Sequence, residues 1–160
     1  MEIMQDIDGL DRFDIKLLAS LQDDSRLTNQ DLADRVGLSP SQCSRRRTRL
    51  ESEGYIRGYA SQADREKLGF GLTVFISVML NTHNRDNARK FADLMRRLPN
   101  VLEAHALTGE MDYQIKLVAR NLRELSDIIN NDLMPHESIQ TVKSSIVLDT
   151  IKETTALPLV

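Results

Sequence analysis

The segment SPSQCSRRRTRLESEG, residues 39–54, places four arginines within five consecutive positions of a chain whose net charge is −3. The stretch 45–57 by itself carries a net charge of +3. Guanidinium groups are forked cations that bind phosphate groups and guanine edges, so a local basic ridge on an acidic chain is typical of docking to nucleic acid. A run of charge can also be no more than a solvated helix surface. The residue types around the arginines therefore decide between docking to nucleic acid and a merely solvated helix surface.

These surrounding residues predict a helix with one buried side and one polar side. Ser39 and Pro40 are typical of a helix start, and Gly54 is typical of a helix end. At about 100° per residue, Cys43 and Leu50 fall on one side, while hydroxyls, an amide and cations fall on the other. Those polar groups are the ones that read base edges in the DNA major groove. The residues predicted to contact DNA on and beside this helix are Ser39, Ser41, Gln42, Ser44, Arg45, Arg46, Arg49 and Arg57.

Two shorter helices are predicted before the arginine-rich one. Asp11 is a suitable N-cap for the first, and Asp14, three residues on, favours the same helix end. Thr28 and Gly37 are a suitable start and end for the second. The gap of about three residues before the third helix is the length of a helix-turn-helix connection. In that motif the first residues of the last helix reach the bases, whereas Thr28 and Asn29 are placed to touch phosphate groups. After Gly54, the sequence YIRGYAS predicts a small hairpin or an exit strand.

A second domain is predicted beyond a polar linker at 61–71. The order of its alternating and helical segments is strand-helix-strand-strand-helix-strand, which is the ferredoxin-like βαββαβ arrangement. Two helices would cover one face of this sheet, and the other face would expose Phe75 and Met79, so we expect a second copy of the chain to cover it. The predicted fold is therefore α+β, with a winged helix-turn-helix in 1–60 and a ligand-binding and oligomerisation domain in 72–160.

Four segments in this order resemble the Lrp/AsnC family of leucine-responsive and asparagine-operon regulators: LDRFDIKLLASLQDDSRLTNQDLADRVGLSPSQC, RLESEGYIRGYASQ, LTGEMDYQIKL and IKETTALPL. The resemblance covers nearly the whole chain. It implies a transcription regulator that dimerises through its C-terminal sheet, often assembles into octamers or wraps DNA, and responds to an amino acid or a related small molecule. The chain departs from the family at Arg47, where an aliphatic residue is usual, and at Glu110-Met111, where an acidic-aromatic pair is common. We expect Arg47 to extend along the core edge toward Glu51 or Glu53.

The resemblance also implies an effector site in loops between subunits, beside a Gly-x-x-Asp turn. The residues that it indicates are Leu107, Thr108, Gly109, Glu110, Met111, Asp112 and Tyr113. Gly109 permits a positive φ, and an ionised Asp112 accepts hydrogen bonds and can hold an ammonium group. Neighbouring main-chain N–H groups can meet a carboxylate, and a free amino acid carries both groups. Glycine and aspartate are equally common in a plain β-turn.

The composition argues against several other classes of protein. With 160 residues, 41% of them hydrophobic and 28% charged, the chain fits one domain or two small ones. It has no apolar run long enough to span a membrane and no signal-peptide layout, and its single cysteine, Cys43, indicates a reducing cytoplasm. The histidines His83, His105 and His136 are far apart, and no nucleophile lies beside a base. We therefore expect no metal site, no cofactor and no enzymatic activity.

The leading interpretation is a sequence-specific DNA-binding transcription regulator. Its expected partners are duplex DNA, further copies of the chain in a dimer or octamer, and an amino acid, with no membrane. An architectural DNA-packaging protein without a small-molecule effector is the alternative. A small ferredoxin-like enzyme with an N-terminal interaction module is a third, although no catalytic residues recommend it.

Overall fold

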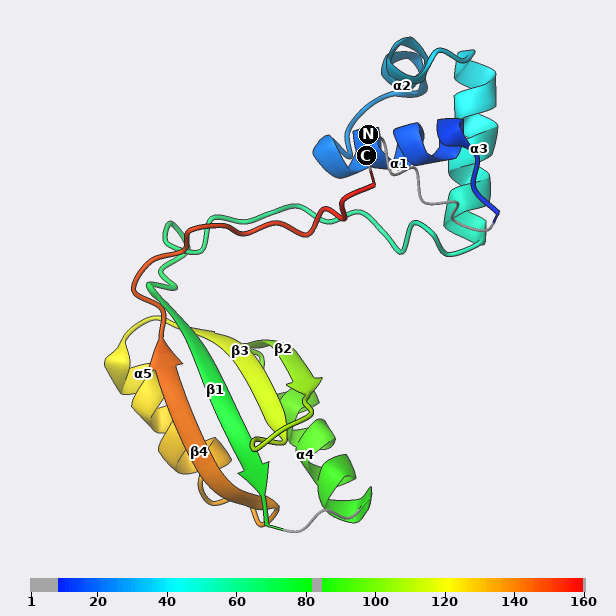
Figure 1. The fold of residues 1–160 in the computed structure, drawn as a ribbon. Helices are drawn as coiled ribbons and strands as arrows, with labels where there is room; N and C mark the ends of the chain where they lie inside the picture. Colours follow the sequence, from blue (N-terminus) through cyan, green and yellow to red (C-terminus); the bar gives the residue numbers. More distant parts are fainter. Residues whose placement is uncertain (1–8, 82–84, 160) are drawn as a thin grey trace. The chain divides into compact units, whose positions relative to one another are not determined.

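The computed structural model describes residues 9–81 and 85–159, which form two compact units (Figure 1). The first unit comprises the chain up to Gln62 together with the tail from Lys152 onward, and the second unit spans Ala63–Ile151. The sequence-based division assigned the tail to the second domain, whereas the contacts group it with the first unit.

The first unit contains three helices, α1 (Arg12–Asp23), α2 (Asn29–Val36) and α3 (Pro40–Ser52). Each begins with a capping box, in which the side chain of Asp11, Thr28 or Ser39 accepts a hydrogen bond from the third backbone N–H of its helix. Gly37 follows α2 in the left-handed conformation, with φ of 77°, which glycine adopts without steric cost. The predicted helix starts and the predicted α2 end are therefore confirmed.

The core of this unit is formed by the apolar sides of the three helices. Its buried members are Leu17, Leu18, Leu21, Leu32, Ala33, Val36, Cys43 and Leu50. Cys43 and Leu50 are 0% exposed, which confirms the predicted buried side of α3. The opposite side of α3 is consequently the one that faces solvent.

The segment after α3 differs from the sequence-based prediction. The described residues between α3 and the first strand of the second unit contain no strand, so the predicted hairpin or exit strand at 55–61 is wrong. Tyr59 instead turns back to α3, where its hydroxyl donates to Glu51 at 2.7 Å and accepts from Arg47 Nε at 2.9 Å. These side-chain bonds hold the segment without a strand ladder.

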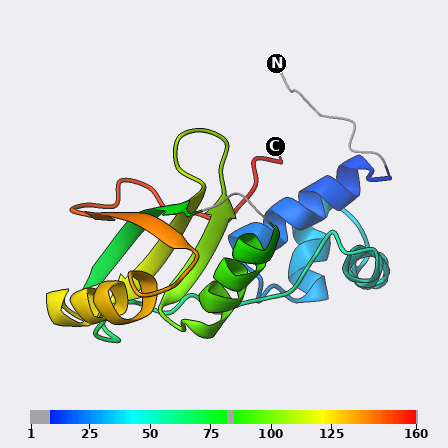
Figure 2. The same cartoon turned by 90° about the horizontal axis from the view of Figure 1, so that it is seen from below.

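The second unit is a four-stranded antiparallel sheet with helices on one face. Its elements are β1 (Leu72–Leu80), α4 (Arg85–Arg97), β2 (Val101–Ala106), β3 (Tyr113–Ala119), α5 (Leu122–Asp127), the π-helix η1 (Ile128–Leu133) and β4 (Ile139–Ile146). The strand order is β2-β3-β1-β4, which confirms the ferredoxin-like arrangement. Figure 2 shows α4 and α5 on the same side of the sheet, where they cover a core centred on Ile76, Phe91 and Leu117.

The alternation along β1 sets which side chains face the helices. Val74, Ile76 and Val78 are fully buried, whereas Phe75 on the other face is 38% exposed. Met79, also on that face, is half-buried. The predicted open face of the sheet, with apolar groups on it, is therefore confirmed.

The tail is held to the first unit by an amide that pairs with main chain. Gln22 Nε2 donates to the carbonyl of Leu157 at 3.1 Å, and the Leu157 N–H donates to Gln22 Oε1 at 2.7 Å. Leu159 packs against the core of the three helices. The tail has no helix or strand, and it is held in place by the Gln22 side chain and by the packing of Leu159.

Removing residues 157–160 is expected to lower the free energy of unfolding of the first unit by about 1–2 kcal/mol, because two hydrogen bonds and one apolar contact are lost. Urea unfolding followed by far-ultraviolet circular dichroism measures the change. Ile151→Ser is the control, because Ile151 is 90% exposed and its replacement should leave the midpoint unchanged. Equal midpoints for the truncated and full chains would contradict the described docking of the tail.

Candidate nucleic-acid interface and effector turn

The solvent-facing side of α3 carries the residue types that the sequence predicted for base contacts. Ser41, Gln42, Arg45 and Thr48 are exposed, while Ser44 is half-buried. Among the described residues, the Arg45 guanidinium has neither an ion-pair partner nor a hydrogen-bond acceptor. A long cation with all its donors unused, on the first two turns of a helix, is suited to a groove lined by acceptors.

Capping bonds already engage part of the predicted contact set at the start of α3. The backbone N–H and the hydroxyl of Ser39 both donate to Gln42 Oε1 at 3.0 Å. The hydroxyls of Ser39 and Ser41 lie 3.1 Å apart. Gln42 therefore offers outward only its amide N–H groups, which are donors and not acceptors.

The N-terminus of α2 brings together Thr28 and Asn29. The Thr28 hydroxyl donates to the Asp31 carboxylate at 2.6 Å and accepts from the Asp31 N–H at 3.2 Å, so its proton and one lone pair are used and one lone pair stays available. The Asn29 side-chain oxygen is buried and has no hydrogen-bond partner among the described residues. The first N–H groups of α2 remain suited to a phosphate.

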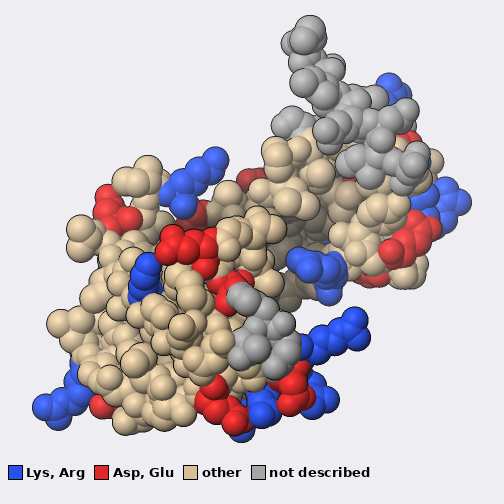
Figure 3. Space-filling view, turned by 60° about the horizontal axis from the view of Figure 1, so that its bottom comes forward, with Lys and Arg blue, Asp and Glu red and all other residues tan. Residues whose placement is uncertain are grey.

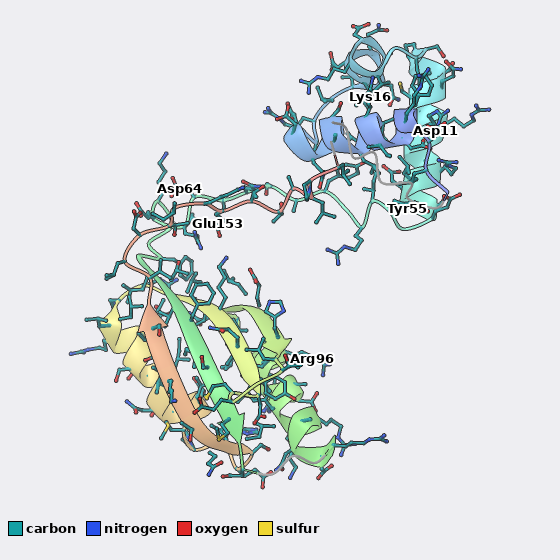
Figure 4. The ribbon with its side chains drawn as sticks, in the orientation of Figure 1. Asp11, Lys16, Tyr55, Asp64, Arg96 and Glu153 are labelled. Atoms are coloured by element: carbon teal, nitrogen blue, oxygen red, sulfur yellow. The ribbon has the colours of Figure 1, made fainter. Side chains whose placement is uncertain are left out.

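Two of the predicted DNA-contacting arginines lie against α1. Arg46 Nη1 is 2.8 Å from one Asp14 oxygen, and Arg49 Nη2 is 2.6 Å from the other. Arg46 Nη1 is also 2.8 Å from Asp11, which lies at the start of α1 (Figure 4). Asp14 is only 1% exposed. The hydrogen bond to Asp14 raises the pKa of Arg46 above its usual value, against the opposing effect of burial.

Asp11 and Asp14 are functional candidates that the sequence reasoning missed. It interpreted both residues only as helix-start signals. The available signal was the coincidence of two acidic caps with an arginine run predicted to lie in the same small domain, but residue spacing does not show which helix faces which.

Arg47, where the family usually has an aliphatic residue, lies along the edge of the core as expected. Its Nε is 3.3 Å from Glu51, and its guanidinium carbon lies 4.8 Å from the centre of the Tyr59 ring. Its Nη1 donates to the carbonyl of Leu27 at 3.3 Å. An ion pair, a stacked ring and a carbonyl thus replace the aliphatic packing.

Arg57 lies on this surface, whereas Cys43 lies in the core beneath it. Arg57 is exposed beyond the end of α3, and no described residue pairs with it. Cys43 is fully buried, and this burial raises the pKa of its thiol, so the thiolate needed for oxidation chemistry is disfavoured.

The predicted effector turn, residues 107–113, is a tightly bonded connection between β2 and β3. The Asp112 carboxylate accepts from the Leu80 N–H at 2.7 Å, and the Asp112 N–H donates to the Val78 carbonyl at 3.0 Å. Gly109 has a φ of 128°, which confirms the expected positive value. The carboxylate that was expected to hold an ammonium group is thus already bonded to the end of β1.

The remaining residues of the turn are divided between solvent and core. Leu107, Thr108, Gly109 and Glu110 are exposed, and Met111 is half-buried. The Tyr113 ring lies 4.4 Å from the Phe91 ring, between centroids, and packs against the core of the second unit. The exposed part of the turn is therefore Leu107–Glu110.

Replacing Asp112 with Ala is expected to lower the free energy of unfolding of the second unit by about 1–2 kcal/mol, because the buried end of β1 loses the acceptor for its Leu80 N–H. Urea unfolding monitored by circular dichroism measures the loss. Glu110→Ala is the control, since the Glu110 side chain is 82% exposed and its contact with Lys143 is 4.0 Å long. A loss as small for Asp112→Ala as for Glu110→Ala would contradict the anchoring role.

Charges of both signs are mixed over the face seen in Figure 3.

Within residues 9–81 and 85–159, no three His, Cys, Asp or Glu side chains are grouped as a metal site would require. His105 lies in β2 with Nε2 at 3.2 Å from Glu103, and His83 lies outside the described residues. No helix in the described part of the chain is long and apolar enough to cross a membrane.

Comparison with known proteins agrees with this geometry. Residues 10–57 match a family model described as winged helix-turn-helix DNA-binding, and residues 73–157 match the Lrp/AsnC ligand binding domain. The leucine-responsive regulatory protein of Rhizobium meliloti is 38% identical over 90% of this chain and 92% of its own length. The Bkd operon transcriptional regulator of Pseudomonas aeruginosa is 36% identical over 94% of this chain and 98% of its own.

Solved structures give the same result. The transcriptional regulator NMB0573 of Neisseria meningitidis, in complex with L-Met, superposes with a TM-score of 0.91 at 42% identity, over 94% of this chain and 97% of that one. E. coli AsnC superposes with a TM-score of 0.84 at 26% identity, over 92% and 97% of the two chains. A helix-turn-helix whose last helix has a polar, exposed side thus precedes a domain that matches the Lrp/AsnC ligand binding domain. The chain belongs to the Lrp/AsnC family and is a DNA-binding transcription regulator.

Proposed function

We propose that this regulator binds duplex DNA as a dimer, with the first turns of α3 from each protomer in the major groove, and that an amino acid changes its assembly or its DNA affinity. The observation that carries the proposal is the unpaired Arg45 beside Ser41 and Gln42, on the side of α3 opposite the fully buried Cys43 and Leu50. A recognition helix of this kind reads bases with its N-terminal residues.

The proposed contacts are of two kinds. Arg45, Ser41 and Gln42 face the base edges, with Arg45 suited to a guanine. Thr28, Asn29 and the exposed Arg57 contact phosphate groups, because the open N–H groups of α2 and an unpaired cation both favour anions. Ser39 and Ser44 complete the set near the start of α3. Arg46 and Arg49 lie on its α1-facing flank.

The proposed dimer forms through the open face of the sheet. Phe75 and Met79 place apolar area there, and a second sheet would remove it from water. Larger assemblies, such as octamers, are compatible with this pairing. Two α3 helices held by one dimer explain how a short helix gains enough contacts for specific binding.

The proposed effector is an amino acid bound beside the turn 107–113. The exposed backbone around Gly109 offers N–H groups for a carboxylate, and Glu110 offers a charge for an ammonium group. The Neisseria relative was solved with L-Met, and the Rhizobium relative is leucine-responsive, so an apolar side chain fits both names. We propose no cofactor and no catalytic role, and we place the activity in the cytoplasm.

The test begins with the wild-type chain and a duplex selected by it from a random-sequence library. Fluorescence anisotropy compares this duplex with a shuffled duplex of the same composition, with and without each proteinogenic amino acid, and light scattering records the assembly. The proposal expects clear preference for the selected duplex and a change in affinity or assembly with at least one amino acid. Equal affinity for both duplexes and no response to any amino acid would overturn it and favour DNA packaging.

A further inference from the structure

Asp14 is a buried carboxylate whose two oxygens are both bound by the recognition helix. Arg46 and Arg49 approach from α3 at 2.8 and 2.6 Å, and the Asp11 N–H donates to Asp14 at 3.1 Å. The carboxylate is 1% exposed, whereas the Arg46 and Arg49 side chains are 22% and 40% exposed. A charge this deeply buried is tolerated only when it is paired, and here each oxygen of the carboxylate faces an arginine of α3.

The ion group extends beyond the three residues and leaves little free charge. Asp11 adds a second carboxylate to Arg46 at 2.8 Å, and Glu53 lies 3.9 Å from Arg49 Nε. The Phe13 ring also lies 5.6 Å from the Arg46 guanidinium carbon. Two of the four arginines of α3 are therefore neutralised by α1 and by the end of α3 itself, while Arg45 is left without a partner.

Two arginines bonded to one carboxylate also restrict the rotation of α3 about its axis. Arg46 and Arg49 are separated by three positions and so lie on the same side of the helix, one turn apart. Holding both at fixed distances from Asp14 sets which side chains point away from α1. Arg45 is about 100° from Arg46 around the helix and points to solvent as a result.

We propose that Asp14 is a positioning residue for sequence recognition: it holds Arg46 and Arg49 away from the duplex and fixes the angle at which α3 presents Arg45. This inference rests on the proposed docking of α3 in DNA. It predicts that a chain without the Asp14 charge binds DNA more strongly but less selectively. The reason is that Arg49 is released and Arg46 keeps only Asp11 as an acidic partner, so both cations are freer to add phosphate attraction, which carries no sequence information.

The main experiment replaces Asp14 with Asn, which keeps the shape and one acceptor oxygen but loses the charge. The selected and shuffled duplexes are titrated at several salt concentrations. We expect affinity for the shuffled duplex to rise and the ratio of the two affinities to fall about tenfold. The slope of log affinity against log salt should steepen by about 0.9 for each arginine that gains a phosphate. A purely structural role would instead weaken binding to both duplexes at an unchanged slope, and that result would overturn the proposal.

Asp23→Asn is the matched control. It makes the same change in net charge and removes the partner of Arg35, which lies 3.1 Å from Asp23 in an exposed ion pair. Arg35 belongs to α2 and not to α3. The selectivity ratio is expected to stay near the wild-type value. If Asp23→Asn and Asp14→Asn lower the ratio equally, net charge alone explains the effect and the positioning role is refuted.

A second variant keeps the proposal testable if Asp14→Asn does not fold. Arg49→Gln retains the Arg46–Asp14 pair and should leave the salt slope unchanged, because Arg49 is held away from phosphate. A slope shallower by about 0.9 would show that Arg49 contacts a phosphate and would contradict the proposal. If the wild-type chain itself shows no preference for the selected duplex, the proposed function fails. A wild-type preference that survives Asp14→Asn refutes only the positioning role.

Discussion

Arg45→Ala is expected to weaken binding to the selected duplex by about 1–3 kcal/mol, because a guanidinium that reads a guanine edge is lost. This loss corresponds to an increase of about 5- to 150-fold in the dissociation constant. Fluorescence anisotropy titration measures it. Arg45 has no partner among the described residues and lies on the exposed side of α3, so the free energy of unfolding should stay close to that of the wild type.

The control for this variant is Arg123→Ala. Arg123 is an exposed arginine on α5 of the second unit, so it matches the charge change without touching α3. Its replacement should leave the preference for the selected duplex unchanged. If Arg45→Ala bound both duplexes as the wild type does, α3 would not be the element that reads the sequence.

Phe75→Lys is expected to raise the dissociation constant of the proposed dimer by at least about 100-fold, because an unpaired ammonium would have to be buried between the two sheets. Lys116 lies directly across from Phe75 in the β1–β3 register, so the new charge also faces a like charge on the same face of the sheet. Light scattering over a dilution series measures the shift. Specific DNA binding should fall with the dimer, since two half-sites are no longer joined.

The control for the sheet variant is Leu122→Lys. Leu122 is 63% exposed and lies on α5, at the helix-covered side of the sheet. We expect this change to leave the dimer intact and far-ultraviolet circular dichroism unchanged. A dimer that survives Phe75→Lys at every dilution would place the interface elsewhere on the chain.

Much of the fold could be predicted because several local signals in the sequence mark the same helix and strand boundaries. Asp11, Thr28 and Ser39 are good caps, and each is followed three positions later by the partner that completes the box. Alternation along β1 correctly divided Phe75 from Ile76, one exposed and the other buried. Such patterns depend on neighbours in sequence, which a sequence shows directly.

The partners of the arginines could not be predicted, because they depend on contacts between helices. A helical projection gives the angle of Arg46 and Arg49 but not which element lies at that angle. Their long side chains then reach Asp14 across 32 and 35 positions of sequence. Arg47 was easier, since its partner Glu51 is one helical turn away.

Other features could not be predicted for similar reasons. Residues 55–61 have the alternation of a strand, but the Tyr59 hydroxyl bonds to Glu51 and Arg47 and so favours a side-chain attachment to α3. The tail has no periodic pattern, and its docking depends on hydrogen bonds between the Gln22 side chain and the main chain of Leu157. Almost any residue at position 157 could make these main-chain bonds, so the residue type gives no signal. In the effector turn, the positive φ of Gly109 followed from its residue type, whereas the Asp112–Leu80 bond did not.

The most direct test of the central claim is a guanine N7 methylation interference measurement on the selected duplex. N7 lies in the major groove, so a methyl group there blocks a helix that reads it. We predict two clusters of interference, about 10–10.5 base pairs apart from centre to centre. In the Arg45→Ala variant, the interference at one guanine in each cluster should disappear. Absence of interference in the wild type, or an identical pattern in the variant, would contradict the placement of α3 in the groove.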